Sequence, residues 1–361
     1  MISALSQAAG KVLGGARFSL INVLPVSVLA AFVAALASSG AYSGGDVHMG
    51  ALFLRLGDHP GWSAAGAFGL LLAGVLLRPF QIALVQILEG YWSGRFAVEL
   101  AADLAIERHR RRLNTAEVLS DSAPPPEPTV EFGELVTHAR RKRRIEKMNV
   151  RGERTVLRYP APVFGTEIHG GGGSAVIGDD DRLMPTMLGN VLRDGEDASG
   201  RRYGLDLQWV AHRLYPQLSP KLDTAITQQL DLLDSIAALC VCFGLATAAG
   251  LPLLFRLDVW SLLPVATVLL VASAYRGALR VASAHAGLLA TAFDLHRFDM
   301  LAALHVELPV TPEREYELNV QLSEFFSDRG ALAKRDLEGL RYVHPTPRAS
   351  GSPPDDGDTS S

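Results

Sequence analysis

Long apolar stretches alternate with charged segments along the chain, and four of these stretches are candidates for membrane-spanning helices. The first covers positions 18–38 and includes the twenty uncharged residues from Phe18 to Ala37. A helix needs about 20 apolar residues to cross roughly 30 Å of hydrocarbon. Lys11 and Arg17 precede this stretch, and Ala35-Leu36-Ala37 ends it in a pattern that resembles a signal-peptide cleavage site. The pattern predicts a retained span, with a cleaved signal peptide as the alternative.

The second stretch, positions 63–92, carries a charge and a proline near its middle. Its uninterrupted apolar part, Ala64 to Leu77, is fourteen residues long and too short to cross a bilayer alone. The helix must therefore continue beyond Pro79, and Tyr91 and Trp92 then lie where aromatic residues favour the membrane interface. At 100° per residue, three polar side chains of this continuation fall within about 80° on one helix face: Arg78, Gln81 and Glu89. We expect an amphipathic, interfacial extension.

Arg78 has two interpretations. In the first, it snorkels toward the headgroups while Pro79 bends the helix. In the second, it faces the interior of a helix bundle, where a charge is costly unless it is paired or hydrated. Glu89 and Asp234 are then the candidate partners.

The third and fourth stretches, positions 233–255 and 260–277, are separated by only four residues, which predicts a tight helical hairpin. Small residues at Ala246 and Gly250 suit close helix contact. Cys240 and Cys242 lie within the third stretch. Because a disulfide between residues two apart is strained and two cysteines do not make a four-ligand metal site, we expect buried free thiols.

Basic residues gather on one side of the predicted spans. The two candidate outer loops hold one arginine each, whereas the inner flanks hold Arg95, Arg108, Arg110, Arg111, Arg112, Arg213, Lys221, Arg276 and Arg280. Cytoplasmic loops carry an excess of Lys and Arg. We therefore expect a multi-pass protein of the bacterial plasma membrane with both termini in the cytoplasm.

The fold class predicted from this pattern is an all-α membrane protein with four transmembrane helices. A helical cytoplasmic domain is expected from positions 93–232, between spans two and three, and from the C-terminal extension at 278–344. Three segments lack apolar periodicity: a Pro-rich linker at 118–133, a Gly-rich loop at 165–181 and a tail at 345–361.

Composition and charge limit the kinds of partner that the protein is expected to bind. The chain is 48% hydrophobic and 20% charged, with a formal net charge of −4, which argues against a nucleic-acid binder. Its densest basic run is Arg140, Arg141, Lys142, Arg143 and Arg144. No aromatic residues that could stack on bases interleave with this run. We interpret it as a solvated face held near the anionic inner-leaflet lipids of the bilayer.

Candidate chemistry is sparse, and no cofactor is predicted. The Gly-rich loop lacks the Gly-Lys-Ser/Thr of a phosphate loop, and its three aspartates lack the alternate spacing of a calcium loop. One cluster on a predicted helix could support acid–base chemistry, namely Asp294, His296, Arg297 and Asp299. Alternating charges on such a helix are usually ion pairs or a surface for a partner, and we favour that interpretation.

Three segments resemble a group of bacterial, actinobacterial-type multi-pass membrane proteins without an assigned activity. They are "LLRPFQIALVQILEGYW", "PTMLGNVLRDGEDASGRRYGLD" with the following "RLYP", and "AFDLHRFDMLAALHVELP". The resemblance covers roughly Leu70 to Pro309, without the Pro-rich linker and the Gly-rich loop. It implies the multi-pass architecture and no particular reaction.

Three functional hypotheses follow. The first is a non-enzymatic membrane-anchored scaffold whose cytoplasmic helices bind a protein partner or a second copy of the chain. The second is a subunit of an oligomeric channel or transporter that uses Arg78. The third is an enzyme at the inner leaflet that uses Asp294, His296 and Asp299. The absence of a recognisable catalytic constellation favours the first hypothesis.

Overall fold

The computed structural model describes residues 23–42, 47–48, 60–92, 94, 96–123, 132–160, 182–327 and 340–344. The predicted Gly-rich loop and C-terminal tail lie outside these residues. Within the described ranges the chain is helical, with one isolated bridge between Val306 and Tyr342 and no strand. The all-α fold class is therefore confirmed. Two compact units are formed, Met1–Ser199 with Ser219–Thr291, and Gly200–Leu218 with Ala292–Ser361.

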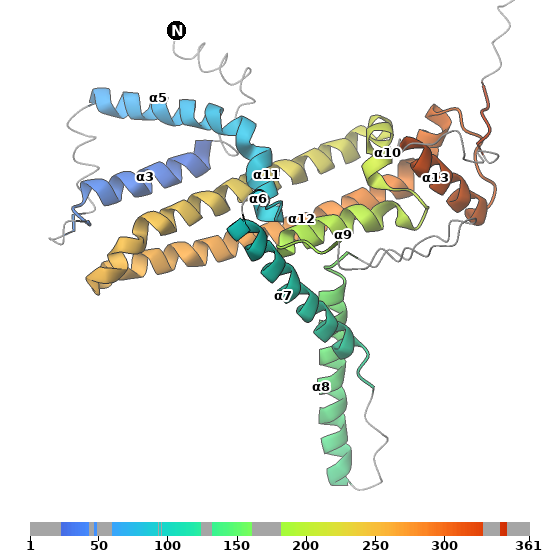
Figure 1. Ribbon diagram of the computed structural model, residues 1–361, viewed down its shortest axis with the longest axis horizontal. Coiled ribbons are helices and arrows are strands. Elements are labelled where there is room, and N and C mark those ends of the chain that lie inside the picture. Colours follow the sequence, from blue (N-terminus) through green and yellow to red (C-terminus); the bar gives the residue numbers. More distant parts are fainter. Residues whose placement is uncertain are drawn as a thin grey trace, which may run out of the picture. The chain divides into compact units, whose positions relative to one another are not determined.

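The helices shown in Figure 1 follow one another in this order: α3 (Leu24–Ser38), α5 (Pro60–Leu77), η2 (Arg78–Phe80), α6 (Gln81–Glu89), α7 (Phe96–Ser120), α8 (Phe132–Val156), α9 (Met187–Arg201), α10 (Leu207–Leu214), η4 (Tyr215–Gln217), α11 (Pro220–Gly250), η5 (Leu251–Arg256), η6 (Val259–Ser261), α12 (Leu262–Ala303) and α13 (Pro312–Phe326). Helix α7 ends at Ser120, inside the segment 118–133 for which the sequence predicted a linker.

Two helical segments are long and apolar enough to cross a membrane. They are Pro220–Arg256, which joins α11 to η5, and Val259–Ala303, which joins η6 to α12. They contain the predicted third and fourth spans. Positions 18–22 of the first predicted span lie outside the described residues, and its described part forms α3, whose 15 residues cover about 22 Å. Four spans are therefore not confirmed.

The second predicted span is broken where the sequence places Arg78-Pro79. The segments Ser63–Leu76 and Gln81–Glu89 meet at 63°, with the 3₁₀ turn η2 between them. Proline lacks the backbone N–H and its ring clashes with the preceding turn, which explains a bend at this point. Helix α6 then ends at Gly90, whose φ of 100° is a left-handed conformation that glycine adopts without a Cβ penalty.

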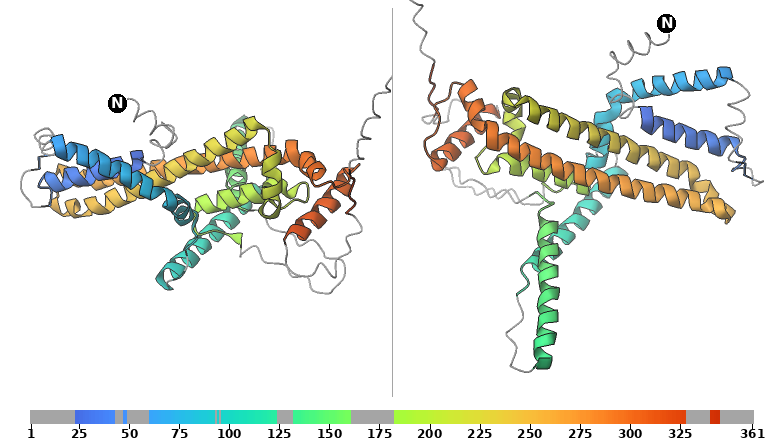
Figure 2. Two further views of the ribbon diagram at one scale, coloured as in Figure 1. Left: turned by 90° about the horizontal axis from the view of Figure 1, so that it is seen from above. Right: turned by 180° about the vertical axis from the view of Figure 1, so that it is seen from behind.

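Helices α11 and α12 run side by side in opposite directions (Figures 1 and 2). At one end, the hydroxyl groups of Thr247 and Thr267 are 2.9 Å apart. Further along, Leu233 of α11 packs with Ala278 and Ala282 of α12 in one buried cluster. Small residues let the two backbones approach closely, as expected for helices that pair within a membrane. Cys240 and Cys242 are buried and free, which confirms the prediction.

The core of the first unit lies where α6, α7, α9, α11 and α12 meet. It is built around Leu188 of α9, which is fully buried, with Ile106 and Leu113 of α7 packed against it. Thr186 caps the first turn of α9, because its Oγ1 accepts a hydrogen bond from the Gly189 N–H at 3.0 Å. The same hydroxyl donates to the carbonyl oxygen of Glu89 at 2.7 Å, which ties α9 to the end of α6.

The second unit packs α10 and α13 around the last turns of α12. Its buried residues include Val210, Leu318 and Phe293. Helix α13 begins at Pro312, and the Thr311 hydroxyl accepts a hydrogen bond from the Arg314 N–H at 3.3 Å.

Candidate functional site

Helices α7 and α8 form an antiparallel hairpin within the first unit (Figure 1). The two helices approach most closely at Gly152 of α8, where an added Cβ would lie 2.6 Å from the backbone oxygen of Ala116. Toward the hairpin tip, the Asn149 amide donates to the Ser122 carbonyl at 3.1 Å. These contacts fix which face of α8 turns toward α7.

The less exposed face of α8 repeats with helical period, and it packs on α7 near Gly152. Half-buried members of this face are His138, Ile145, Met148, Asn149 and Val156, together with the buried Gly152. Residues three and four apart share one side of a helix. The opposite side of α8 is therefore its exposed side.

That opposite side is entirely basic between positions 140 and 154. At 100° per residue, the positions on an arc of about 100° opposite the packed face are all Arg or Lys: Arg140, Arg143, Arg144, Lys147, Arg151 and Arg154. We call this set the cationic face. All six residues are exposed, and no ion pair joins them to an acidic side chain of the described chain.

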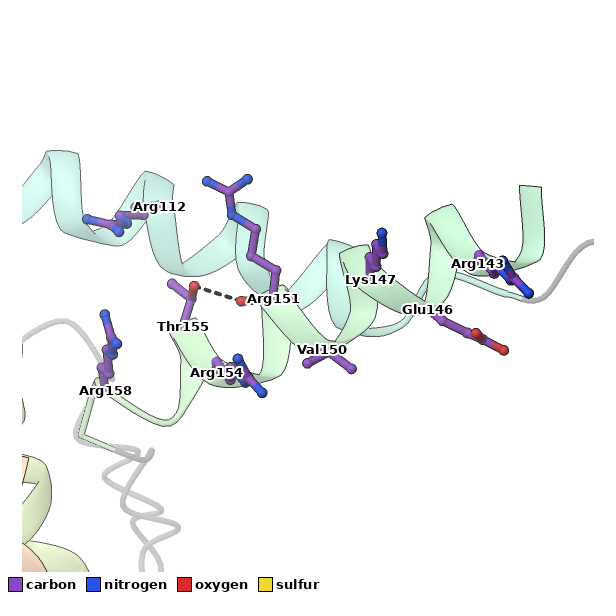
Figure 3. A pocket seen from close by; sticks show the side chains of 9 residues that line it. All are labelled: Arg112, Arg143, Glu146, Lys147, Val150, Arg151, Arg154, Thr155 and Arg158. Carbon is purple, nitrogen blue, oxygen red and sulfur yellow. Dashed lines mark hydrogen bonds between the residues drawn. The ribbon is translucent and has the colours of Figure 1, made fainter. Parts of the chain in front are cut away.

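An open hollow of about 620 Å³ runs along this part of the hairpin. Arg112 of α7 and Arg158, just past the end of α8, add two cations to its lining, and Glu146 is the only acidic residue there. Figure 3 shows Arg151 and Lys147 projecting on one side of α8, with Val150 and Glu146 on the other. A second hollow of about 540 Å³ extends the basic lining to Arg140 and Arg144.

The predicted basic run is only part of this surface. Consecutive residues point in different directions on a helix, so Arg141 and Lys142 lie on the side of the half-buried residues, away from the cationic face. Lys147, Arg151 and Arg154 complete the face and lie outside the predicted run. A search for basic residues at helical spacing through position 154 would have found them.

The base of the hairpin is held by His109 of α7 and Tyr159, which follows α8. Nδ1 of His109 and the Tyr159 hydroxyl are 2.9 Å apart, and the rings meet edge to face at 5.7 Å. Burial lowers the pKa of His109, and the neighbouring Arg112 and Arg108 guanidinium groups lower it further. Burial also raises the pKa of Tyr159. A neutral imidazole and a neutral phenol therefore meet here at pH 7.

The predicted acid–base cluster does not form one site. Arg297 turns to α13, where its Nε donates to Oε1 of the buried Glu315 at 2.5 Å. Its guanidinium also stacks on the Tyr203 ring, 4.1 Å from the centroid. Asp294 accepts a hydrogen bond from the Tyr203 hydroxyl at 2.6 Å. These contacts join α12, α13 and the turn after α9 within the second unit.

The remaining two members pair with each other, because Nδ1 of His296 lies 2.9 Å from Oδ2 of Asp299. Burial raises the pKa of Tyr203, and its hydrogen bond to Asp294 raises it further. Among the described residues, no group of three or more His, Cys, Asp or Glu is arranged to hold a metal ion. The contacts of Arg297 and Asp294 support the ion-pair interpretation of this helix.

The candidate intramembrane residues are only partly placed. The side chain of Arg78 lies outside the described part of the chain, so its pairing with Glu89 or Asp234 stays a prediction. The backbone carbonyl of Glu89 is occupied by Thr186, and Asp234 is half-buried on α11, the helix against which α6 packs.

No protein-family profile, curated protein or solved structure gives a significant match to this chain.

Proposed function

We propose that the protein is an integral membrane protein that acts as an interaction module, and that it binds an acidic surface of a partner protein through the cationic face of α8. The observation that carries the proposal is the set of six exposed Arg and Lys side chains, without an acidic partner in the described chain. Charges of one sign repel each other, and a complementary surface relieves that repulsion.

The dimensions and chemistry of the cationic face favour a protein segment. From Arg140 to Arg154 the face covers about 21 Å along the helix axis, the length of an acidic helix of four turns. The exposed large apolar side chains of the described part of α8 are Leu135, Val136 and Val150, too few to form an apolar face for burial in a bilayer interface. No aromatic side chain lies on the cationic face to stack on bases, which argues against a nucleic-acid partner.

The membrane topology is part of the proposal. We propose four spans, with both termini and the α7–α8 hairpin on the cytoplasmic side of a bacterial plasma membrane. The excess of Lys and Arg next to the inner ends of the apolar stretches supports this orientation. Anionic inner-leaflet lipids are then the competing ligand of the cationic face, since each Lys or Arg near such a surface contributes about 1 kcal/mol of attraction.

The test compares two double variants of the full-length protein. R143Q/K147Q removes two charges from the cationic face, and R141Q/K142Q removes one Arg and one Lys from the other side of α8. Both double variants lose one Arg and one Lys from the same helix, so they differ only in where the lost charges were. Each protein is extracted from its own cells in mild detergent, and co-purifying proteins and lipids are quantified by mass spectrometry.

We expect a protein with an acidic segment to be retained by the wild type and by R141Q/K142Q. R143Q/K147Q should retain about tenfold less of it, because exposed charge pairs contribute up to about 1 kcal/mol each. High salt should release it from the wild type. Equal retention by both variants contradicts the proposal. If the two variants differ only in the amount of anionic lipid that they retain, the cationic face binds the bilayer instead of a protein.

A further inference from the structure

A third cavity of the first unit lies at the base of the hairpin and has two chemically different ends. Its volume is about 660 Å³, within the range of small-molecule binding sites. Helices α6, α7, α9 and α12 all contribute to its walls. We call it the basal groove.

One end of the basal groove is apolar. Ile87 and Leu88 of α6, Leu104 of α7 and Met187 of α9 line it, and Trp92 closes one side. Ile87 and Leu104 are 51% and 65% exposed, so this apolar lining is open to its surroundings and not filled by the described chain. A hydrocarbon chain is the natural occupant of such a surface.

The other end of the basal groove is cationic, and its two arginines differ from their neighbours. Arg110 and Arg111 are paired with the carboxylate of Glu107, at 2.7 and 2.8 Å. Arg108 and Arg112 are four positions apart, so they share one side of α7, and both line the groove. No ion pair joins either of them to an acidic side chain of the described chain. Both arginines can therefore bind an anionic ligand in the groove.

The groove lies at the level where the apolar stretches end. Trp92 comes directly after the apolar sequence of α6, with its indole N–H donating to the Ile87 carbonyl at 2.7 Å. Tyr275 lines the groove at the end of the apolar sequence of α12 and is followed by Arg276. Tyr and Trp gather at the boundary between hydrocarbon and headgroups. The apolar end therefore borders hydrocarbon and the cationic end borders headgroups.

From this arrangement we infer that the basal groove binds one anionic phospholipid. The lipid phosphate lies between Arg108 and Arg112, and an acyl chain lies along Ile87, Leu88 and Leu104. Basic pockets between membrane helices are established binding sites for anionic headgroups. The site shares Arg112 with the hollow beside the cationic face and no residue with the face itself. A variant at Ala105, which lines the groove and not that hollow, tests the lipid inference independently of the proposed partner.

The test is native mass spectrometry of the delipidated full-length protein in mild detergent, titrated with phosphatidylglycerol and with phosphatidylcholine. R108Q/R112Q removes the charges in the groove, and R110Q/R111Q removes two neighbouring charges of the same helix that are already paired. A third variant, A105W, keeps every arginine and fills the groove, because Ala105 lines it.

We expect the wild type and R110Q/R111Q to prefer phosphatidylglycerol. R108Q/R112Q should bind it about thirtyfold more weakly, since each arginine contributes about fivefold. A105W should lose lipid retention despite its unchanged charge, and excess inorganic phosphate should not displace the lipid. Equal binding of the two lipids by the wild type, equal losses in both arginine variants, or full displacement by phosphate would each overturn the inference.

Discussion

Replacing Gly152 by alanine tests whether the α7–α8 contact orients the cationic face. Alanine is the better helix former by about 1 kcal/mol, so propensity alone predicts a more stable α8. The new Cβ, however, would lie 2.6 Å from the Ala116 oxygen and 2.7 Å from the Ser120 nitrogen. Both are backbone atoms and cannot rotate away. Overpacking of this kind costs about 1–3 kcal/mol, so the clash outweighs the gain.

The net expectation for Gly152→Ala is a loss of about 1 kcal/mol in the local stability of α8, or about fivefold faster amide exchange. The matched control is Gly287→Ala on α12, where no atom lies within 4 Å of the added Cβ. There the helix should gain about 1 kcal/mol and exchange more slowly. Hydrogen-exchange mass spectrometry of the full-length protein reads both helices. Slower exchange of α8 in Gly152→Ala would refute the close packing.

Three further predictions concern individual polar contacts. Glu315→Gln should lower the stability of α13 by about 3 kcal/mol, because it leaves the Arg297 guanidinium buried without its counter-charge, whereas Glu317→Gln at an exposed pair should change little; exchange of α13 amides reads both. Thr311→Ala should cost α13 about 1 kcal/mol in the same measurement, because the N-cap is lost. The pKa of His109 lies below its ordinary value of 6.5, so the folded state binds fewer protons and stability should fall as the pH drops below about 6.5; His109→Asn should remove this pH dependence of the thermal midpoint.

The sequence predicted those features of the fold that follow from hydropathy and from the chemistry of single residue types. The hairpin of α11 and α12, the bend at Pro79 and the buried thiols follow from hydropathy and from the chemistry of proline and cysteine. The end of α7 at Ser120 does not, because the Pro-rich segment from position 118 predicts a linker. Where a helix ends depends on capping and neighbouring contacts, which composition does not specify.

The functional surfaces needed tertiary information. Helical spacing alone can group the basic residues of α8, but the burial of its residues had to be known before the exposed side could be identified. Arg108 and Arg112 appeared in the sequence only as signs of membrane orientation. Their distinction from Arg110 and Arg111 depends on which side chains reach Glu107. Arg297 finds its partner eighteen positions along the chain, beyond any local spacing rule.

The central claim, that a partner occupies the cationic face, is tested most directly by lysine acylation in membranes isolated from cells that make the protein. Lys147 lies on the cationic face and Lys142 on the other side of α8, both are exposed, and they share one helix, so one serves as the control for the other. We predict that Lys147 is protected relative to Lys142 and becomes equally reactive after a high-salt wash. Equal reactivity of the two lysines before the wash would contradict it.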